Sequence, residues 1–147
     1  MVLNILYNSL MLKDLTLNKK KTLMGLLHNK LVRNGFSGKT GIRVKWHTSR
    51  ESMPKRDVSL EDLAASVLFG RIQGDAWEGK YQNEAKFQVV GNDLSGDTLK
   101  LIFLVNYNDI NPRKWVFDLV TVFTIHDAEA GQPASAVFNL RFEAFQF

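Results

Sequence analysis

The sequence predicts an α+β fold in which N-terminal helices pack on one face of a four- to five-stranded antiparallel β-meander. Apolar residues recur at helical spacing in the first half of the chain, whereas the second half is rich in Val, Ile, Phe and Thr. Short loops that carry Gly, Asn and Pro separate the later segments, and short loops between consecutive strands favour antiparallel pairing. The 147 residues contain no internal repeat and no linker-like stretch, so we expect a single domain over residues 1–147.

The first 12 residues are apolar, but they are too few to span a bilayer, and Asn4, Asn8 and Ser9 interrupt them. No basic stretch precedes them and no small-residue cleavage site follows, so we expect a first strand or helix of the fold rather than a signal peptide. The absence of Cys excludes disulfides and thiolate chemistry and fits a reducing compartment. We therefore expect a cytoplasmic protein that does not use a membrane as a partner.

A helix is predicted over Thr16–Asn34, because Leu23, Leu27 and Leu31 fall on one face at helical spacing. Most of its lysines fall elsewhere around the helix. Gly35 follows at the position where helices commonly end with a positive φ, which only glycine adopts at no steric cost.

The next segment, Gly41–His47, alternates apolar and basic residues. Such alternation predicts a half-buried strand with a cationic outer face. The predicted inner residues are Ile42, Val44 and Trp46, and the predicted outer residues are Arg43, Lys45 and His47.

Two stretches have the Ser/Thr-x-x-acid form of a helix capping box, "TSRE" at 48–51 and "SLED" at 59–62. Apolar residues continue at helical spacing after Ser59 as far as Gly70, which predicts a capped amphipathic helix. The helix that begins near Thr48 should be short, because Pro54 would break it within about two turns.

The remainder of the chain is predicted to form strands over Lys86–Val90, Leu99–Tyr107, Trp115–His126 and Ala136–Phe147. The Leu99–Tyr107 segment is apolar at nearly every position, so we expect it in the centre of the sheet. Residues 71–84 are predicted to form a long loop that carries Trp77 and Tyr81.

The Ala136–Phe147 segment ends the given chain with apolar residues. A strand with such an end is an edge that needs cover. We therefore expect a homodimer that forms through this strand.

Charge is distributed unevenly along the chain. Residues 1–57 hold twelve Lys and Arg against three acidic residues, a net charge of +9, whereas residues 58–147 carry a net charge of −5. A basic face of this kind would suit a polyanion, unless the two halves intermingle in space.

No motif of high specificity is present, because the sequence has no phosphate-binding loop, dinucleotide fingerprint, serine elbow or zinc-protease motif. The best cluster lies in the stretch 46–71, where His47 is followed by Arg50 and Arg56. An imidazole that moves the 2′-hydroxyl proton and a guanidinium that holds the phosphate suit metal-free RNA cleavage. We therefore name His47, Arg50, Arg56 and the later His126 as candidate catalytic residues.

A non-catalytic interpretation fits the same residues. In it His47 only caps or packs at the end of its strand, and the arginines form ion pairs with Glu51, Asp57 or Glu61.

Four further residues are candidates for binding. Arg43 and Lys45 extend the cationic face and would bind phosphate, while Trp77 and Tyr81 would either stack on bases or line a small-molecule pocket. The three histidines are far apart in the sequence, so we expect no metal site and no cofactor.

Three stretches, "HTSRESMPKRDVSLEDLAASVLFGR", "KFQVVGNDLSGDTLKLIFLV" and "FDLVTVFTI", resemble a family of small proteins known only as a domain of unknown function. That family has a His, then Met-x-x-Arg-x-Val/Ile-Ser at the start of a helix, then strands that read Val-Val-Gly and Val-Thr-Val. The resemblance covers residues 46–126. The matching residues are Met53, Arg56, Val58, Ser59, Gly91, Gly96 and Thr121.

The resemblance implies the fold of the RelE, barnase, EndoU and colicin-type ribonucleases, in which helices precede a twisted antiparallel sheet. One residue departs from the family pattern. The family histidine typically stands five residues before the methionine, whereas His47 stands six before Met53, so that Thr48 occupies the expected position.

Two functions remain open from the sequence. The first is an RNA-binding protein or a metal-independent endoribonuclease of toxin type. The second is a non-enzymatic, dimeric protein that binds a small molecule or a protein, similar to the orphan proteins of mobile gene cassettes or to a toxin-neutralising partner. The expected partners are therefore RNA, a second copy of the chain and a cognate protein.

Overall fold

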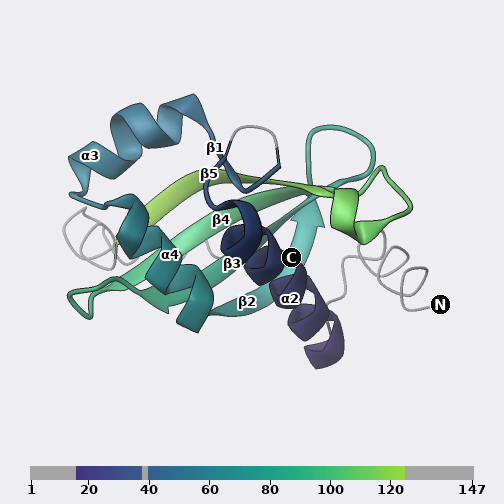
Figure 1. Ribbon diagram of the computed structural model, residues 1–147, viewed down its shortest axis with the longest axis horizontal. Helices are drawn as coiled ribbons and strands as arrows, with labels where there is room; N and C mark the ends of the chain where they lie inside the picture. The colour runs from purple at the N-terminus through teal and green to yellow at the C-terminus, as the bar shows by residue number, and fades with distance from the viewer. Residues whose placement is uncertain (1–15, 38–39, 125–147) are drawn as a thin grey trace.

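The computed structural model describes residues 16–37 and 40–124, in which helices precede and cover a five-stranded sheet (Figure 1). The α+β prediction is confirmed. The predicted strand Ala136–Phe147, the first 12 residues and His126 lie outside the described residues, so the homodimer expectation stays a prediction.

The elements are α2 (Leu17–Asn34), β1 (Arg43–Val44), the π-helical turn η1 (Thr48–Ser52), α3 (Met53–Lys55), α4 (Leu60–Phe69), β2 (Arg71–Glu78), β3 (Glu84–Asn92), β4 (Thr98–Asn106), the 3-10 turn η2 (Pro112–Lys114) and β5 (Val116–Thr124).

The strands lie in the order β1-β5-β4-β3-β2, and β2 to β5 form an antiparallel meander in which β3, β4 and β5 correspond to predicted strands. The short β1 pairs with β5 in parallel, with Arg43 opposite Asp118, so the sheet is mixed rather than fully antiparallel. The strand β4 occupies the centre and is buried over most of its length, as predicted. The sheet therefore has β1 and β2 at its two opposite edges.

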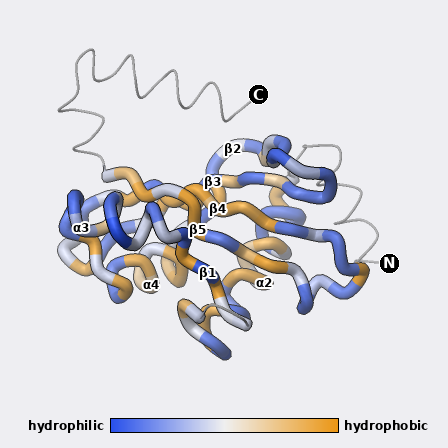
Figure 2. The backbone as a smooth tube through the Cα atoms, turned by 90° about the horizontal axis from the view of Figure 1, so that it is seen from above, coloured by the Kyte–Doolittle hydropathy of each residue, from blue (hydrophilic) through white to orange (hydrophobic). Residues whose placement is uncertain are grey.

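The helix α2 begins and ends as its sequence predicts. The Thr16 side chain accepts a hydrogen bond from the Lys19 amide at the N-cap, and Gly35 ends the helix with φ of 64°. Leu23, Leu27 and Leu31 are buried against the sheet. Figure 2 shows α2 and α4 on the same side of the sheet.

The helix α4 has the full capping box predicted from "SLED". Ser59 accepts from the Asp62 amide, and the Asp62 carboxylate accepts from the Ser59 amide at 3.0 Å. The same carboxylate accepts from the Leu94 amide at 3.0 Å, which ties the start of α4 to the β3–β4 turn. These backbone hydrogen bonds, from Ser59 first and Leu94 second, lower the pKa of Asp62 below its ordinary value.

The prediction of a long loop over 71–84 is wrong, because Arg71–Glu78 forms the edge strand β2 against β3. The register shifts between Gln73 and Trp77, and Gly74 in that interval has φ of 76°. Such a bulge interrupts the alternation of buried and exposed residues by which a strand is recognised in sequence.

Candidate functional site

The stretch that follows β1 does not form the strand end predicted from its alternation. Only Arg43 and Val44 are in the strand, and the chain is helical from Trp46 onward. Trp46, predicted to point inward, is 67% exposed. His47 therefore lies in the first turn of a helical segment, with helical backbone angles and no side-chain capping bond.

This helical segment is held against β5 by its buried side. The Thr48 hydroxyl donates to the Val120 carbonyl, and Thr48, Ser52 and Met53 are all buried. The "TSRE" capping box is thus wrong, because the tertiary contact with β5 uses the threonine that would have capped the helix. The Met53 amide bonds to the Thr48 carbonyl, five residues earlier, as in a π-helical turn.

The outer side of the same segment carries His47, Arg50 and Glu51. The Nδ1 atom of His47 lies 2.8 Å from Oε2 of Glu51, and both side chains are more than half exposed. A carboxylate accepts hydrogen bonds, so Nδ1 carries the proton in this contact and Nε2 faces away from Glu51. Glu51, which the non-catalytic interpretation pairs with an arginine, thus contacts His47.

One buried carboxylate orients two basic residues, Arg43 in β1 and Lys45 directly after it. The Arg43 guanidinium donates to both oxygens of Asp118, at 2.5 and 2.8 Å, and the Lys45 ammonium lies 3.4 Å from Asp118 Oδ2. The Asp118 hydrogen bond and charge raise the pKa of Arg43 above its ordinary value. The two cations share one negative charge, so this group stays positively charged at neutral pH.

A pocket of about 510 Å³ lies along the β1 edge of the sheet, and we call it the β1-edge pocket. The exposed Trp46 and the basic residues Arg43 and Lys45 line it together. Its lining residues are Phe36, Ser37, Arg43, Val44, Lys45, Trp46, Ser49, Leu60 and Asp118. Trp46 is not among the site residues predicted from the sequence, and the signal that could have indicated its exposure is the predicted helix start at Thr48.

Arg56 lies elsewhere, in a second pocket of about 580 Å³ that we call the acidic pocket. Its guanidinium also contacts the Ser52 carbonyl at 3.5 Å. The lining residues are Lys55, Arg56, Asp57, Ser59, Asp62, Asp93, Ser95, Asp97 and Thr124. Arg50 and His47 line neither pocket, so neither of these two pockets brings the three described catalytic candidates together.

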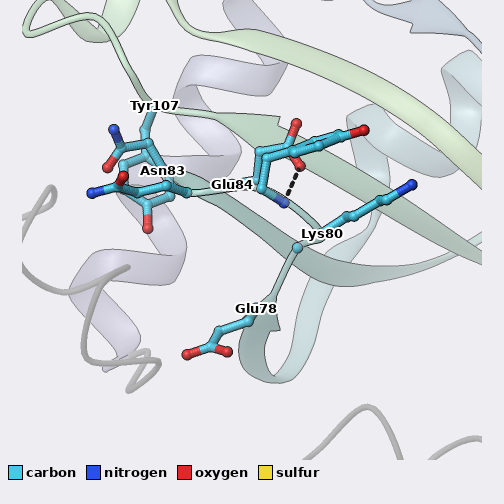
Figure 3. A pocket seen from close by; sticks show the side chains of 8 residues that line it. Glu78, Lys80, Asn83, Glu84 and Tyr107 are labelled. Atoms are coloured by element: carbon cyan, nitrogen blue, oxygen red, sulfur yellow. Dashed lines mark hydrogen bonds between the residues drawn. The ribbon is translucent and has the colours of Figure 1, made fainter.

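Trp77 and Tyr81 lie far from the β1 edge, because β2 is the opposite edge strand. Trp77 is half-buried and pairs with Lys86. Tyr81 lines a pocket of about 310 Å³ at the β2–β3 turn, where its amide donates to Glu84 Oε1 at 3.1 Å. The labelled Glu78 and Lys80 side chains around this pocket point in different directions (Figure 3), so they do not converge on one ligand position.

His28 has a structural contact rather than a place in any of these pockets. Its Nε2 lies 2.6 Å from the Val67 carbonyl, close to the end of α4. A carbonyl can only accept, so Nε2 is the protonated ring nitrogen, and the contact ties α2 to α4.

No family model, curated protein or solved structure matches this chain. The resemblance to a ribonuclease-fold family and the roles of the site residues therefore stay predictions. Within residues 16–37 and 40–124, no helix is both long enough and apolar enough to cross a membrane.

Proposed function

We propose that this chain binds single-stranded RNA at the β1-edge pocket. The observation that carries the proposal is that the exposed Trp46 lines one pocket together with Arg43 and Lys45. Proteins that bind single strands combine an aromatic side chain, on which a base stacks, with cations that pair with the phosphates. Phe36, Val44 and Leu60 supply apolar walls around the same position.

The electrostatics of the region support an anionic ligand. Residues 16–50 contain nine Lys and Arg and no Asp or Glu. Asp118 is buried and holds Arg43 and Lys45 in place, so the cations are positioned before a ligand arrives. Positioning of this kind lowers the entropy cost of binding.

Binding of a labelled single-stranded RNA tests the proposal. Loss of one base stack should weaken binding by about 1–3 kcal/mol, which is about 5- to 150-fold in Kd, so Trp46→Ala should raise Kd by that factor and Trp46→Phe by less. Tyr81→Ala is the matched control, because Tyr81 is similarly exposed at 64% but lies beyond the opposite edge of the sheet. Equal binding by wild type and Trp46→Ala, or an equal loss with Tyr81→Ala, would contradict the proposal.

RNA rather than DNA is the expected partner because of the resemblance to a ribonuclease-fold family. A DNA strand of the same sequence should therefore bind less tightly. Equal affinity for the two strands would leave binding to single strands intact and overturn the preference for RNA.

Metal-independent RNA cleavage is a second candidate, favoured by the His47–Glu51 pair. Glu51 would orient the imidazole, and Nε2 would accept the proton of the 2′-hydroxyl as that oxygen attacks the phosphorus. Nε2 would then return this proton to the 5′-oxygen as its bond to phosphorus breaks, with Arg50 on the same turn to hold phosphate. His47→Ala should lower the cleavage rate in EDTA by about 10²- to 10⁴-fold. Binding without cleavage at any pH between about 5 and 8 would contradict this second candidate and leave RNA binding alone as the function.

A further inference from the structure

A second basic surface lies where the C-terminal half of α2 meets η2. The Lys30 ammonium donates to the Arg113 carbonyl at 3.1 Å, although the two residues are 83 positions apart. This contact brings cations of both elements together. We call the group Lys30, Arg33, Arg113 and Lys114 the α2–η2 surface.

The charges of this surface are not balanced by acids. Arg33, Arg113 and Lys114 are exposed, and in the described part of the chain none of them forms an ion pair. Lys30 is bound to a neutral carbonyl, and burial lowers its pKa from the ordinary value. Asp109, the acid nearest in sequence to η2, accepts the Asn111 amide at 2.9 Å and so shapes the turn.

Two features link the elements of the α2–η2 surface to those of the β1-edge pocket. The Ile42 amide, just before β1, donates to the Gly35 carbonyl at the end of α2 at 2.9 Å. In η2, Lys114 stands four residues before Asp118, which is the partner of Arg43. At the rise of an extended chain, four residues span roughly 13 Å. One strand of nucleic acid can therefore reach both places.

We infer that the α2–η2 surface binds the phosphate backbone of the same RNA strand whose base stacks on Trp46. This inference rests on the proposed function and adds the course of the strand, from the β1 edge across the end of α2 to η2. Four cations that form no ion pair among the described residues suit a polyanion. Phosphate contacts of this kind set the position of a strand without reading its sequence.

The salt dependence of binding tests the inference, because each phosphate contact on a single strand contributes about −0.7 to the slope of log K against log salt. The double variant Arg33→Gln/Lys114→Gln removes two exposed cations and leaves the Lys30 contact in place. Its slope between roughly 50 and 200 mM KCl should be less steep than that of wild type by about 1.4, for an RNA of about 12 nucleotides.

The matched control is Lys55→Gln/Arg71→Gln. It removes the same net charge from exposed positions, one beside the acidic pocket and one at the start of the far edge strand β2. Its slope should equal that of wild type. Circular dichroism confirms that both double variants are folded.

The outcomes separate this inference from the proposed function. If RNA binds and Trp46→Ala weakens it, but Arg33→Gln/Lys114→Gln leaves the slope unchanged, the inference alone is overturned. An equal change of slope in both double variants also overturns it, because the effect would then be one of net charge. If wild type does not bind the RNA at all, the proposed function and the inference both fail.

Discussion

The β1-edge pocket is lined by two cations and one acid, whereas the acidic pocket is lined by four aspartates and two cations. The stretch from Arg43 to Asp62 contributes residues to both pockets. At the β1 edge a single buried carboxylate, Asp118, orients two cations toward solvent. At the acidic pocket the carboxylates of Asp62 and Asp93 accept backbone amides, in the cap of α4 and in the β3–β4 turn. The comparison teaches that the partner of a charged group, rather than its sign, decides whether it is available to a ligand.

The largest effect should come from the carboxylate of the β1 edge. Asp118→Asn removes the charged partner of Arg43 and Lys45 across the only parallel strand pair of the described sheet. We expect a loss of about 2–3 kcal/mol in the free energy of unfolding. This loss is smaller than the cost of breaking a fully buried ion pair, because the Arg43 side chain is 45% exposed. Urea unfolding measures it.

Glu51→Gln is the control for that prediction. Glu51 belongs to an exposed pair with His47, so its removal should change the free energy of unfolding by less than about 0.5 kcal/mol. Equal losses in the two variants would mean that burial of Asp118 does not set its contribution.

A smaller effect is expected at the acidic pocket. Asp62→Asn weakens the capping box of α4 and should cost about 1 kcal/mol. The pKa of Asp62 is lowered in the folded state, so its contribution is present above the ordinary value of 3.8 and is lost as the pH falls through the folded value. Unfolding measured from pH 5 down to about 2 should therefore show a shallower loss of stability in the variant than in wild type.

The smallest expected effect is on RNA affinity, and it should differ between substitutions of Arg43 and of Arg56. Arg43→Gln removes a cation of the β1-edge pocket and should weaken binding about three- to fivefold at 0.15 M salt, the contribution of one phosphate contact. Arg56→Gln should leave binding unchanged, because Arg56 lies among the aspartates of the acidic pocket. A larger loss with Arg56→Gln would shift the RNA site to the acidic pocket and contradict the distinction between the two regions.

The candidate site was only partly predictable from the sequence. Arg43 and Lys45 were named as phosphate-binding residues, and they do line one pocket together. Trp46 was assigned to the inside of a strand, because alternation is a local pattern and cannot reveal that the chain turns into a helix after Val44. His47 and Arg56 were grouped by their closeness in sequence, whereas the chain separates them between an exposed turn and the acidic pocket.

The sequence by itself determined the α+β class, the limits of α2, the capping box of α4 and the central place of β4, since periodicity and caps act over a few residues. Tertiary structure alone decided the bulged β2, the parallel pairing of β1 and the exposure of Trp46. The tertiary contacts of Arg43 with Asp118, Thr48 with Val120 and Lys30 with Arg113 likewise join residues more than 70 positions apart. No local pattern encodes such pairs, because each depends on how the whole sheet assembles.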